Sequence, residues 1–307
     1  MIRNGSSDQY QRIRNGAGFF AIQICEHCSN VQRDGILSKF FARGGVMATD
    51  AKWTETAAVL GGIKLHLARA GGGRPLLVLH HDIGSPDRLD FYDALASHFE
   101  VFVPHHPGYG RSERPQWLRN VRDVAVLYQW LLADLGVERA SLVGLGFGGW
   151  IAAEMATMAP REFHRLVLVG AMGLKPPEGH IFDQAIVSYI DYARAGFHDQ
   201  QAFARVYGDV STDQLVEWDL CREMCFRIAW KPYMYSQTLP YLLDGVRAPA
   251  LVVWGDDDKI VPRSAGERYA ELLPRAKFEI VRAAGHCVEM EQPDHLLRLV
   301  RSFVEEN

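Results

Sequence analysis

Two residue types that together can move a proton occur in distinctive segments near the C-terminus. Asp258 lies in "VVWGDDDKIVP" and His286 in "AGHCVEMEQP". A carboxylate that fixes one nitrogen of an imidazole leaves the other nitrogen free to act as a general base. A third segment, "LVGLGFGGW", has the form of a strand that turns sharply into a helix, and Gly146 stands at the tip, where a catalytic serine is normally held. Gly146 offers no oxygen, so these segments predict acid–base chemistry without a serine nucleophile.

Apolar runs and amphipathic helical patterns alternate from residue 55 onward. "TETAAVL" and "IKLHLAR" flank Gly61 and Gly62 and predict a hairpin. Continuous apolar runs such as "PLLVLHH", "VFVPHH", "ASLVG", "RLVLVG" and "ALVVWG" are typical of buried strands. Helical patterns separate them, including "SPDRLDFYDALASHF" and "VRDVAVLYQWLLADLG". This order predicts an α/β fold with a mostly parallel sheet and helices on both faces.

The alternation breaks once and is preceded by a different kind of segment. Residues 173–245 contain helical stretches rich in aromatic side chains and no strand-like run, which predicts a helical cap inserted into a core formed by residues 51–172 and 246–307. Residues 1–50 are polar and glycine-rich without a clear period, so we expect a poorly ordered extension. Met47 is an alternative start. "CEHC" in the extension is a C-x-x-C without a second ligand pair.

The composition of the chain limits the kinds of partner that we expect. The chain has 307 residues, of which 48% are hydrophobic, and a net charge of −4, with no basic run of the kind that binds nucleic acid. No apolar run approaches the roughly 20 residues that span a bilayer. Five cysteines at scattered spacings do not form a disulfide framework, which favours a cytoplasmic protein. We expect a small-molecule substrate, no nucleic-acid or membrane partner and no cofactor; a homo-oligomer stays open.

These segments together resemble the α/β-hydrolase fold superfamily over residues 55–305. In that family a nucleophile, an acid and a histidine follow in this order, which the resemblance maps onto Gly146, Asp258 and His286, with Gly146 as a nucleophile position that lacks a nucleophile. "LHHDIGS" matches the loop that normally reads His-Gly-x and supplies one oxyanion donor. The resemblance therefore implies that backbone N–H groups of Phe147 and Asp82 form the oxyanion hole, and that His81 lines the substrate site.

Other candidates for a nucleophile have simpler explanations. Ser85 is expected to cap the helix that follows it, and Ser112 in "GRSERP" resembles a structural turn of the family. Ser141 begins a strand at the wrong end of the sheet. Cys287 is adjacent to His286, and neighbouring side chains on an extended loop tend to point apart.

Four histidines raise a metal alternative. His80 and His81 end one strand of the expected sheet, and His105 and His106 end its neighbour, so all four lie at the carboxyl edge where sites form. With Asp82 and His286 nearby, histidine and carboxylate ligands could bind a divalent ion. The alternative is that side-chain directions alternate and part of this set only bonds to backbone; we predict no resident metal.

Two functions from different classes fit the sequence. The first is a hydrolase of a small, apolar ester or lactone, or a lyase, that uses a His286–Asp258 general base and a water or substrate group in the space left at Gly146. The second is a catalytically inactive relative that binds a small ligand. A glycine introduced in place of serine is a third explanation of position 146. The aromatic side chains of the cap suggest an apolar substrate, or they simply pack the cap: Phe182, Tyr189, Tyr192, Phe197, Trp218, Trp230, Tyr233 and Tyr235.

Overall fold

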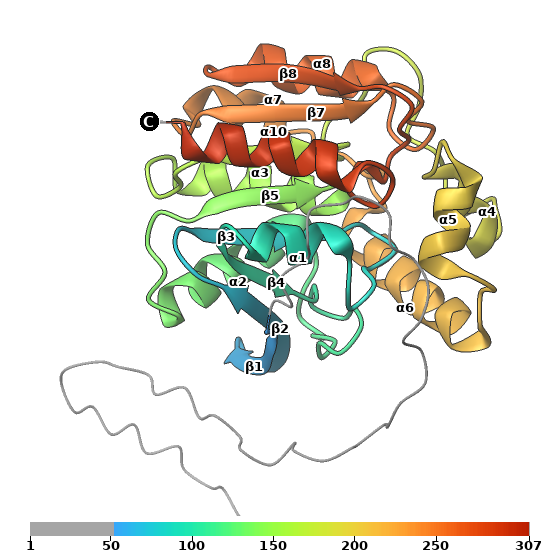
Figure 1. The fold of residues 1–307 in the computed structure, drawn as a ribbon, viewed down its shortest axis with the longest axis horizontal. Coiled ribbons are helices and arrows are strands. Elements are labelled where there is room, and N and C mark those ends of the chain that lie inside the picture. The colour runs from blue at the N-terminus through green and yellow to red at the C-terminus, as the bar shows by residue number, and fades with distance from the viewer. Residues whose placement is uncertain (1–51, 307) are drawn as a thin grey trace, which may run out of the picture.

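The computed structural model describes residues 52–306, and a single eight-stranded sheet runs through them (Figure 1). The strand order is β1-β2-β4-β3-β5-β6-β7-β8. β1 and β2 form an antiparallel hairpin, β2 is antiparallel to β4, and all other neighbours are parallel. The strands are Thr54–Leu60 (β1), Ile63–Gly71 (β2), Pro75–Leu79 (β3), Glu100–Pro104 (β4), Ser141–Leu145 (β5), Leu166–Val169 (β6), Ala250–Gly255 (β7) and Ala276–Val281 (β8).

The central strands are apolar along their whole length because both faces of the sheet are covered. Every residue of β5 and β6 is buried. One face packs against α2 (Val121–Asp134), α3 (Phe147–Met158) and α8 (Arg263–Leu272), and the other against α1 (Asp90–Ala96) and α10 (Pro293–Glu305). The short helix α9, Val288–Glu291, lies just before α10. The α/β prediction with a mostly parallel sheet is therefore confirmed.

A group of helices separates β6 from β7 at the carboxyl end of the strands (Figure 1). It comprises α4 (Tyr189–Ala195), α5 (Gln200–Tyr207) and α6 (Thr212–Ala229), and it is called the cap below. The short helix α7 (Leu239–Leu242) follows in the chain and lies beside β7. Phe197 and Trp218 are buried in a small apolar cluster of their own, whereas Trp230 is about half exposed. Many of the aromatic side chains of the cap therefore pack within the protein and stabilise the cap. The exact limits of core and cap stay predictions, and the expected extension at residues 1–50, with its C-x-x-C, lies outside the described residues.

One local prediction at the first helix is wrong. Ser85 does not cap α1, because the helix begins only at Asp90, with Leu89 at the cap position. The Ser85 hydroxyl instead donates to the carbonyl of Pro86 and lies 2.9 Å from the hydroxyl of Tyr92. We expected the helix to begin near Pro86, but the residues between Ser85 and Asp90 form a loop.

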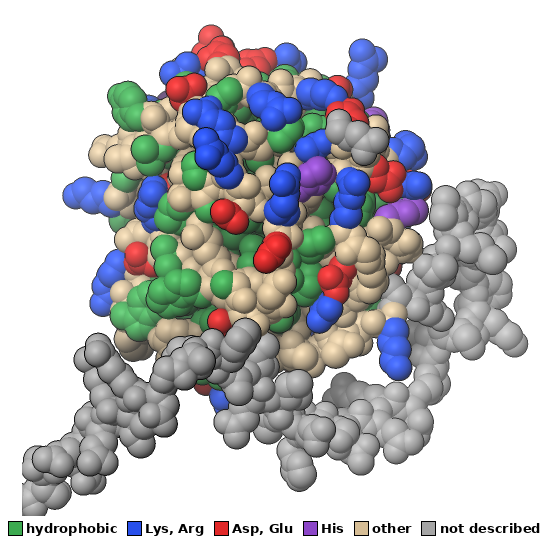
Figure 2. Space-filling model, turned by 90° about the vertical axis from the view of Figure 1, so that its left-hand side faces the viewer, with side chains coloured by type: hydrophobic (Ala, Val, Ile, Leu, Met, Phe, Trp, Pro, Cys, Tyr) green, Lys and Arg blue, Asp and Glu red, His purple; other side chains and the backbone are tan. Residues whose placement is uncertain are grey.

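The surface agrees with the charge pattern of the sequence. Figure 2 shows Lys and Arg side chains scattered among acidic and hydrophobic ones on one face, without a continuous basic stripe among the residues described there. None of the helices in the described part of the chain is both long and apolar enough to cross a bilayer.

Candidate active site

The turn between β5 and α3 has the tight geometry that the sequence suggested. Gly146 precedes the first helical residue, Phe147, with a φ of 52° and a ψ of −111°. Residues other than glycine rarely adopt this backbone conformation without strain. Gly148 is equally constrained, since a Cβ atom there would lie 2.1 Å from the carbonyl oxygen of Leu79 on the neighbouring strand. The glycines thus allow α3 to approach the sheet closely.

His286 and Asp258 form a buried pair beside this turn. Nδ1 of His286 lies 2.9 Å from Oδ2 of Asp258, and the other carboxylate oxygen accepts from the backbone N–H groups of Ile260 and Val261. The carboxylate is therefore held in place by its own loop. Burial lowers the pKa of His286, but the charge and the hydrogen bond of Asp258 outweigh burial, and the net pKa is raised above 6.5.

A second histidine–carboxylate pair faces the first across Gly146. Nε2 of His81 lies 3.0 Å from Oε1 of Glu289, and both side chains are almost completely buried. His81 follows β3, and Glu289 belongs to α9, three residues after His286. The two imidazole rings are 4.9 Å apart between their centroids. The site therefore contains two imidazoles, each bonded to its own carboxylate.

The imidazole of His81 occupies the space that a side chain at position 146 would need. A Cβ atom on Gly146 would lie 2.3 Å from Nδ1 of His81 and 2.8 Å from Nε2 of His286. Atoms this close would overlap, so glycine is the residue that lets both rings approach the turn. Our expectation that the place of a side chain at position 146 is open to a water or a substrate group is therefore wrong, because Nδ1 of His81 lies only 2.3 Å from that place.

The hydrogen bonds determine which ring nitrogens carry lone pairs. A carboxylate only accepts, so the N–H groups at Nδ1 of His286 and Nε2 of His81 each donate a hydrogen bond to their carboxylates. In the neutral rings the opposite nitrogens, Nε2 of His286 and Nδ1 of His81, are acceptors. Both are buried and have no hydrogen-bond partner among the described residues. Two unused lone pairs are thus directed at the same turn.

Asp82 adds a carboxylate to this group. It is 1% exposed, and its Oδ2 accepts a hydrogen bond of 2.8 Å from the hydroxyl of Tyr192 on the cap helix α4. The expected oxyanion donors lie at suitable points of the backbone: Phe147 is the first residue of α3, so its N–H has no partner within the helix. The role of Asp82 and Phe147 as oxyanion donors stays a prediction.

The remaining histidines of the sequence cluster are used for structure. Nδ1 of His80 bonds the carbonyl oxygen of His81, and its Nε2 accepts from the backbone N–H of His106. His106 in turn bonds the carbonyl oxygen of His80 through Nε2 and the hydroxyl of Tyr128 through Nδ1. Burial lowers the pKa of His106 to about 3 and that of His80 in the same direction, so both rings are neutral. Nδ1 of His105 accepts from the backbone N–H of Arg111. The four histidines therefore do not form one metal site; only His81 reaches the turn.

None of the alternative nucleophiles is placed for attack. The hydroxyl of Ser112 donates to the carbonyl of His105 and accepts from the backbone N–H of His66. Ser141 begins β5, at the opposite end of the strand from Gly146. Burial raises the pKa of the Cys287 thiol, which keeps it protonated.

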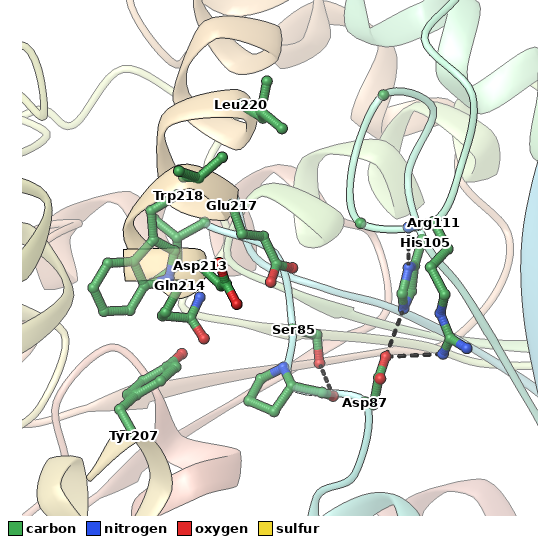
Figure 3. Close-up of a pocket in the computed structure, with 15 residues that line it drawn as sticks. Ser85, Asp87, His105, Arg111, Tyr207, Asp213, Gln214, Glu217, Trp218 and Leu220 are labelled. Atoms are coloured by element: carbon green, nitrogen blue, oxygen red, sulfur yellow. Dashed lines mark hydrogen bonds and ion pairs between the residues drawn. The ribbon is translucent and has the colours of Figure 1, made fainter. Parts of the chain in front are cut away.

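An open groove of about 640 Å³ lies next to this site, between the cap and the loops after β3 and β4 (Figure 3). Asp213, Gln214 and Glu217 come from α6 and face three linked side chains, in which Asp87 lies between His105 and Arg111. Ile83, the residue after Asp82, is part of the groove wall, and the histidines of the site are not. The groove therefore reaches the layer of residues that covers the reactive groups.

Sequence reasoning placed Gly146, Asp258, His286, His81 and Asp82 in one site, and the structure brings all five together. It missed Glu289, which lies inside the segment "AGHCVEMEQP", because its partner His81 lies 208 positions away in the chain. The available signal was weak: an acidic residue one helical turn after a site histidine. It also treated Tyr192 only as a cap aromatic, whereas its hydroxyl contacts the site.

Comparison with known proteins gives a consistent result. Residues 76–298 match the alpha/beta hydrolase family. The chain is 27% identical to a 2-hydroxy-6-oxononadienedioate/2-hydroxy-6-oxononatrienedioate hydrolase of Paraburkholderia phymatum, covering 84% of this chain and 98% of the relative. It is 27% identical to a 2-hydroxymuconate semialdehyde hydrolase of Pseudomonas sp. (strain CF600), covering 81% and 93%.

Solved structures show the same fold. A mutant of a meta-cleavage product hydrolase superposes with a TM-score of 0.69 at 22% identity, covering 82% of this chain and 98% of that one. A membrane phospholipase A superposes with a TM-score of 0.70 at 21% identity, covering 82% and 86%. Because the family match extends over most of the described residues, the chain belongs to the alpha/beta hydrolase family.

Proposed function

We propose that this protein is a hydrolase of a small, largely apolar ester or lactone in which His286 activates water directly. The observation that carries the proposal is the pair of buried, unpartnered ring nitrogens beside Gly146. A general base needs a lone pair that no hydrogen bond uses and a partner that holds the ring. Nε2 of His286 has that lone pair, and Asp258 is the partner. No serine, and so no covalent acyl intermediate, takes part.

The reaction follows from the placement of these groups. Nε2 of His286 takes a proton from a water, and the hydroxide attacks the carbonyl carbon of the substrate. The N–H groups of Phe147 and Asp82 stabilise the negative charge that develops on the carbonyl oxygen. His286 then returns the proton to the leaving oxygen as the ester bond breaks, which yields the acid and the alcohol. A general base and an oxyanion donor contribute about 10²–10⁴-fold and about 10²–10³-fold to the rate, respectively.

The packing of His81 against Gly146 supports a natural glycine at this position. In the family loop that "LHHDIGS" resembles, the position of His81 is usually glycine, and the position of Gly146 is usually serine. In this chain the large side chain, His81, is on the loop and the glycine, Gly146, is at the turn. The His81 ring lies where a side chain at position 146 would be. A serine placed at 146 in the present chain would overlap that ring.

The substrate class rests on two observations. The groove is bordered by aromatic and charged side chains, among them Tyr207, Trp218 and Arg111, which suits an organic molecule with an apolar body and a polar end. The names of two relatives describe hydrolases of small hydroxy-oxo acids and a semialdehyde. Such compounds therefore belong in the substrate screen beside esters and lactones, where they also report proton abstraction of the lyase type.

The test is a screen of the purified chain against p-nitrophenyl acetate, lactones and 2-hydroxy-6-oxo-dienoates. We expect turnover that falls about 10²–10⁴-fold in His286→Asn, since the asparagine amide can still reach Asp258 but offers no basic nitrogen. His180→Ala, which removes an exposed histidine, is the matched control and should leave the rate unchanged. Turnover that persists in His286→Asn contradicts the proposal. Absence of turnover with every compound, together with saturable binding of one of them, supports the ligand-binding alternative instead.

A further inference from the structure

The side chains around Gly146 also have the composition of a metal site. One nitrogen of His81, one of His286 and one carboxylate oxygen of Asp82 all lie within 4.8 Å of one another, and all three residues are buried. Two imidazoles and one carboxylate are ligands that first-row transition metals prefer, and such sites keep positions open for water. The metal alternative of the sequence already included Asp82 and His286 beside the four histidines, and of those four histidines only His81 belongs to this set.

The directions of the ring nitrogens favour a cation over an anion. Both His81 and His286 direct an unpartnered nitrogen at the turn, and a carboxylate oxygen of Asp82 lies within 4.8 Å of a nitrogen of each ring. Two lone pairs and a negative charge attract a positive ion, and they offer nothing to an anion. Leaving such acceptors buried without a partner is unfavourable for the folded state.

Every member of the set also has an outer partner. Asp258 holds the far nitrogen of His286, Glu289 holds the far nitrogen of His81, and the Tyr192 hydroxyl holds one oxygen of Asp82. A carboxylate that accepts the second N–H of a metal-binding histidine is the usual outer shell of a zinc site, where it fixes the ring and makes the ligating nitrogen more basic. The site has this arrangement twice.

A second group, His81 with Cys287 and Glu289, is less suited. His81 and Glu289 are already bonded to each other at 3.0 Å, and the Cys287 thiol would have to lose its proton in a buried position, where burial opposes its charged form. The unused nitrogens beside Gly146 therefore identify the better site.

From these observations we infer that His81, Asp82 and His286 bind one divalent transition-metal ion, such as Zn²⁺ or Co²⁺, beside Gly146. The ion uses the lone pair of His286 that the general base of the proposed function also uses. The two roles therefore exclude each other on the same atom.

The test is a titration of the chelator-treated full chain with Co²⁺, followed by its visible ligand-field absorption, and competition with Zn²⁺. Cys25→Ser with Cys28→Ser serves as the background, since the C-x-x-C of the N-terminal segment could bind an ion by itself. We expect one equivalent of Co²⁺ in this background and displacement by Zn²⁺.

The variants are chosen to keep the outer hydrogen bonds. His81→Gln can still donate to Glu289, and His286→Asn to Asp258, but each lacks the free ring nitrogen, so both should lose the bound ion. Glu289→Gln should weaken binding by about 10- to 100-fold. His105→Gln, next to the site but not in it, should bind as tightly as the background. Absence of the one-equivalent transition, or binding that persists unchanged in His81→Gln and His286→Asn, overturns the inference.

The two proposals can fail separately. Ester or lactone hydrolysis by the chelator-treated protein, dependent on His286, tests the proposed function without any ion. The Co²⁺ absorption tests the metal site without any turnover.

Discussion

Two pairs of buried histidines lie side by side in this protein, and they differ in how their nitrogens are used. His80 and His106 are 3.7 Å apart between ring centroids, and all four of their ring nitrogens have hydrogen-bond partners. His81 and His286 use one nitrogen each and leave the other without a partner. The first pair links the ends of β3 and β4. Each ring of the second pair keeps one nitrogen lone pair that no hydrogen bond uses, which is characteristic of a reactive site.

The comparison also shows why residue type alone does not identify a site. His80 and His81 are adjacent in the chain, and both are almost fully buried. Because consecutive side chains point in different directions, one ring meets the backbone of the next strand and the other meets Gly146. Their chemistry is therefore set by direction and partners, and the following changes test that difference.

The largest effect on stability should come from the satisfied pair. His106→Ala removes a buried ring and leaves the hydroxyl of Tyr128 and the carbonyl of His80 without partners. We expect a loss of about 3–5 kcal/mol in the free energy of unfolding. His286→Asn keeps a donor for Asp258 and should lose about 1 kcal/mol. Urea denaturation of both variants measures the difference, and equal losses would contradict the division into structural and reactive pairs.

The reactive pair should tolerate an exchange that restores the family arrangement. His81→Gly combined with Gly146→Ser frees the space and adds a hydroxyl next to Nε2 of His286. We expect hydrolysis of p-nitrophenyl acetate to rise about 100-fold over either single variant, since a base within reach of the nucleophile contributes about 10²–10⁴-fold. Gly146→Ser alone should gain little, because His81 overlaps its side chain. A gain as large in the single variant would show that His81 moves aside freely.

The smallest expected effect is on the pH profile. The neutral form of His286 is the base, and the net effect of its surroundings is to raise its pKa above 6.5. The rate kcat/KM should therefore rise with pH, with a midpoint above 6.5, and fall as the ring becomes protonated at lower pH. Asp258→Asn removes the charge that raises the pKa, so the midpoint should move to lower pH while the maximal rate declines. A midpoint that does not move in Asp258→Asn would show that Asp258 does not raise the pKa of the catalytic base.

Much of this architecture follows from the sequence, for physical reasons. Buried parallel strands must be apolar throughout, so runs such as "SLVGL" mark them, and the Gly-rich turn after Leu145 marks the close contact of α3 with the sheet. Asp258 and His286 could be found because each lies in a segment that resembles a family motif. The start of α1 was misplaced because Pro86 is compatible with both a first helical turn and an extended loop.

The rest depends on distances that one sequence does not contain. Glu289 acquires its importance from His81, and nothing local distinguishes it from any acidic residue on a short helix. The filling of the space at Gly146 depends on the direction of a ring from another strand. Whether His80 or His81 points into the site depends on how β3 ends, and a shift of one residue would exchange their roles.

The hydroxyl of Tyr192 joins a cap helix to the carboxylate of Asp82 in the core, and this contact has a mechanical consequence. Any displacement of α4 that uncovers the reactive nitrogens also removes the phenol from the carboxylate. Tyr192 therefore joins the cap to the charged groups around Gly146, and a change in the position of α4 would change the hydrogen bonding of Asp82.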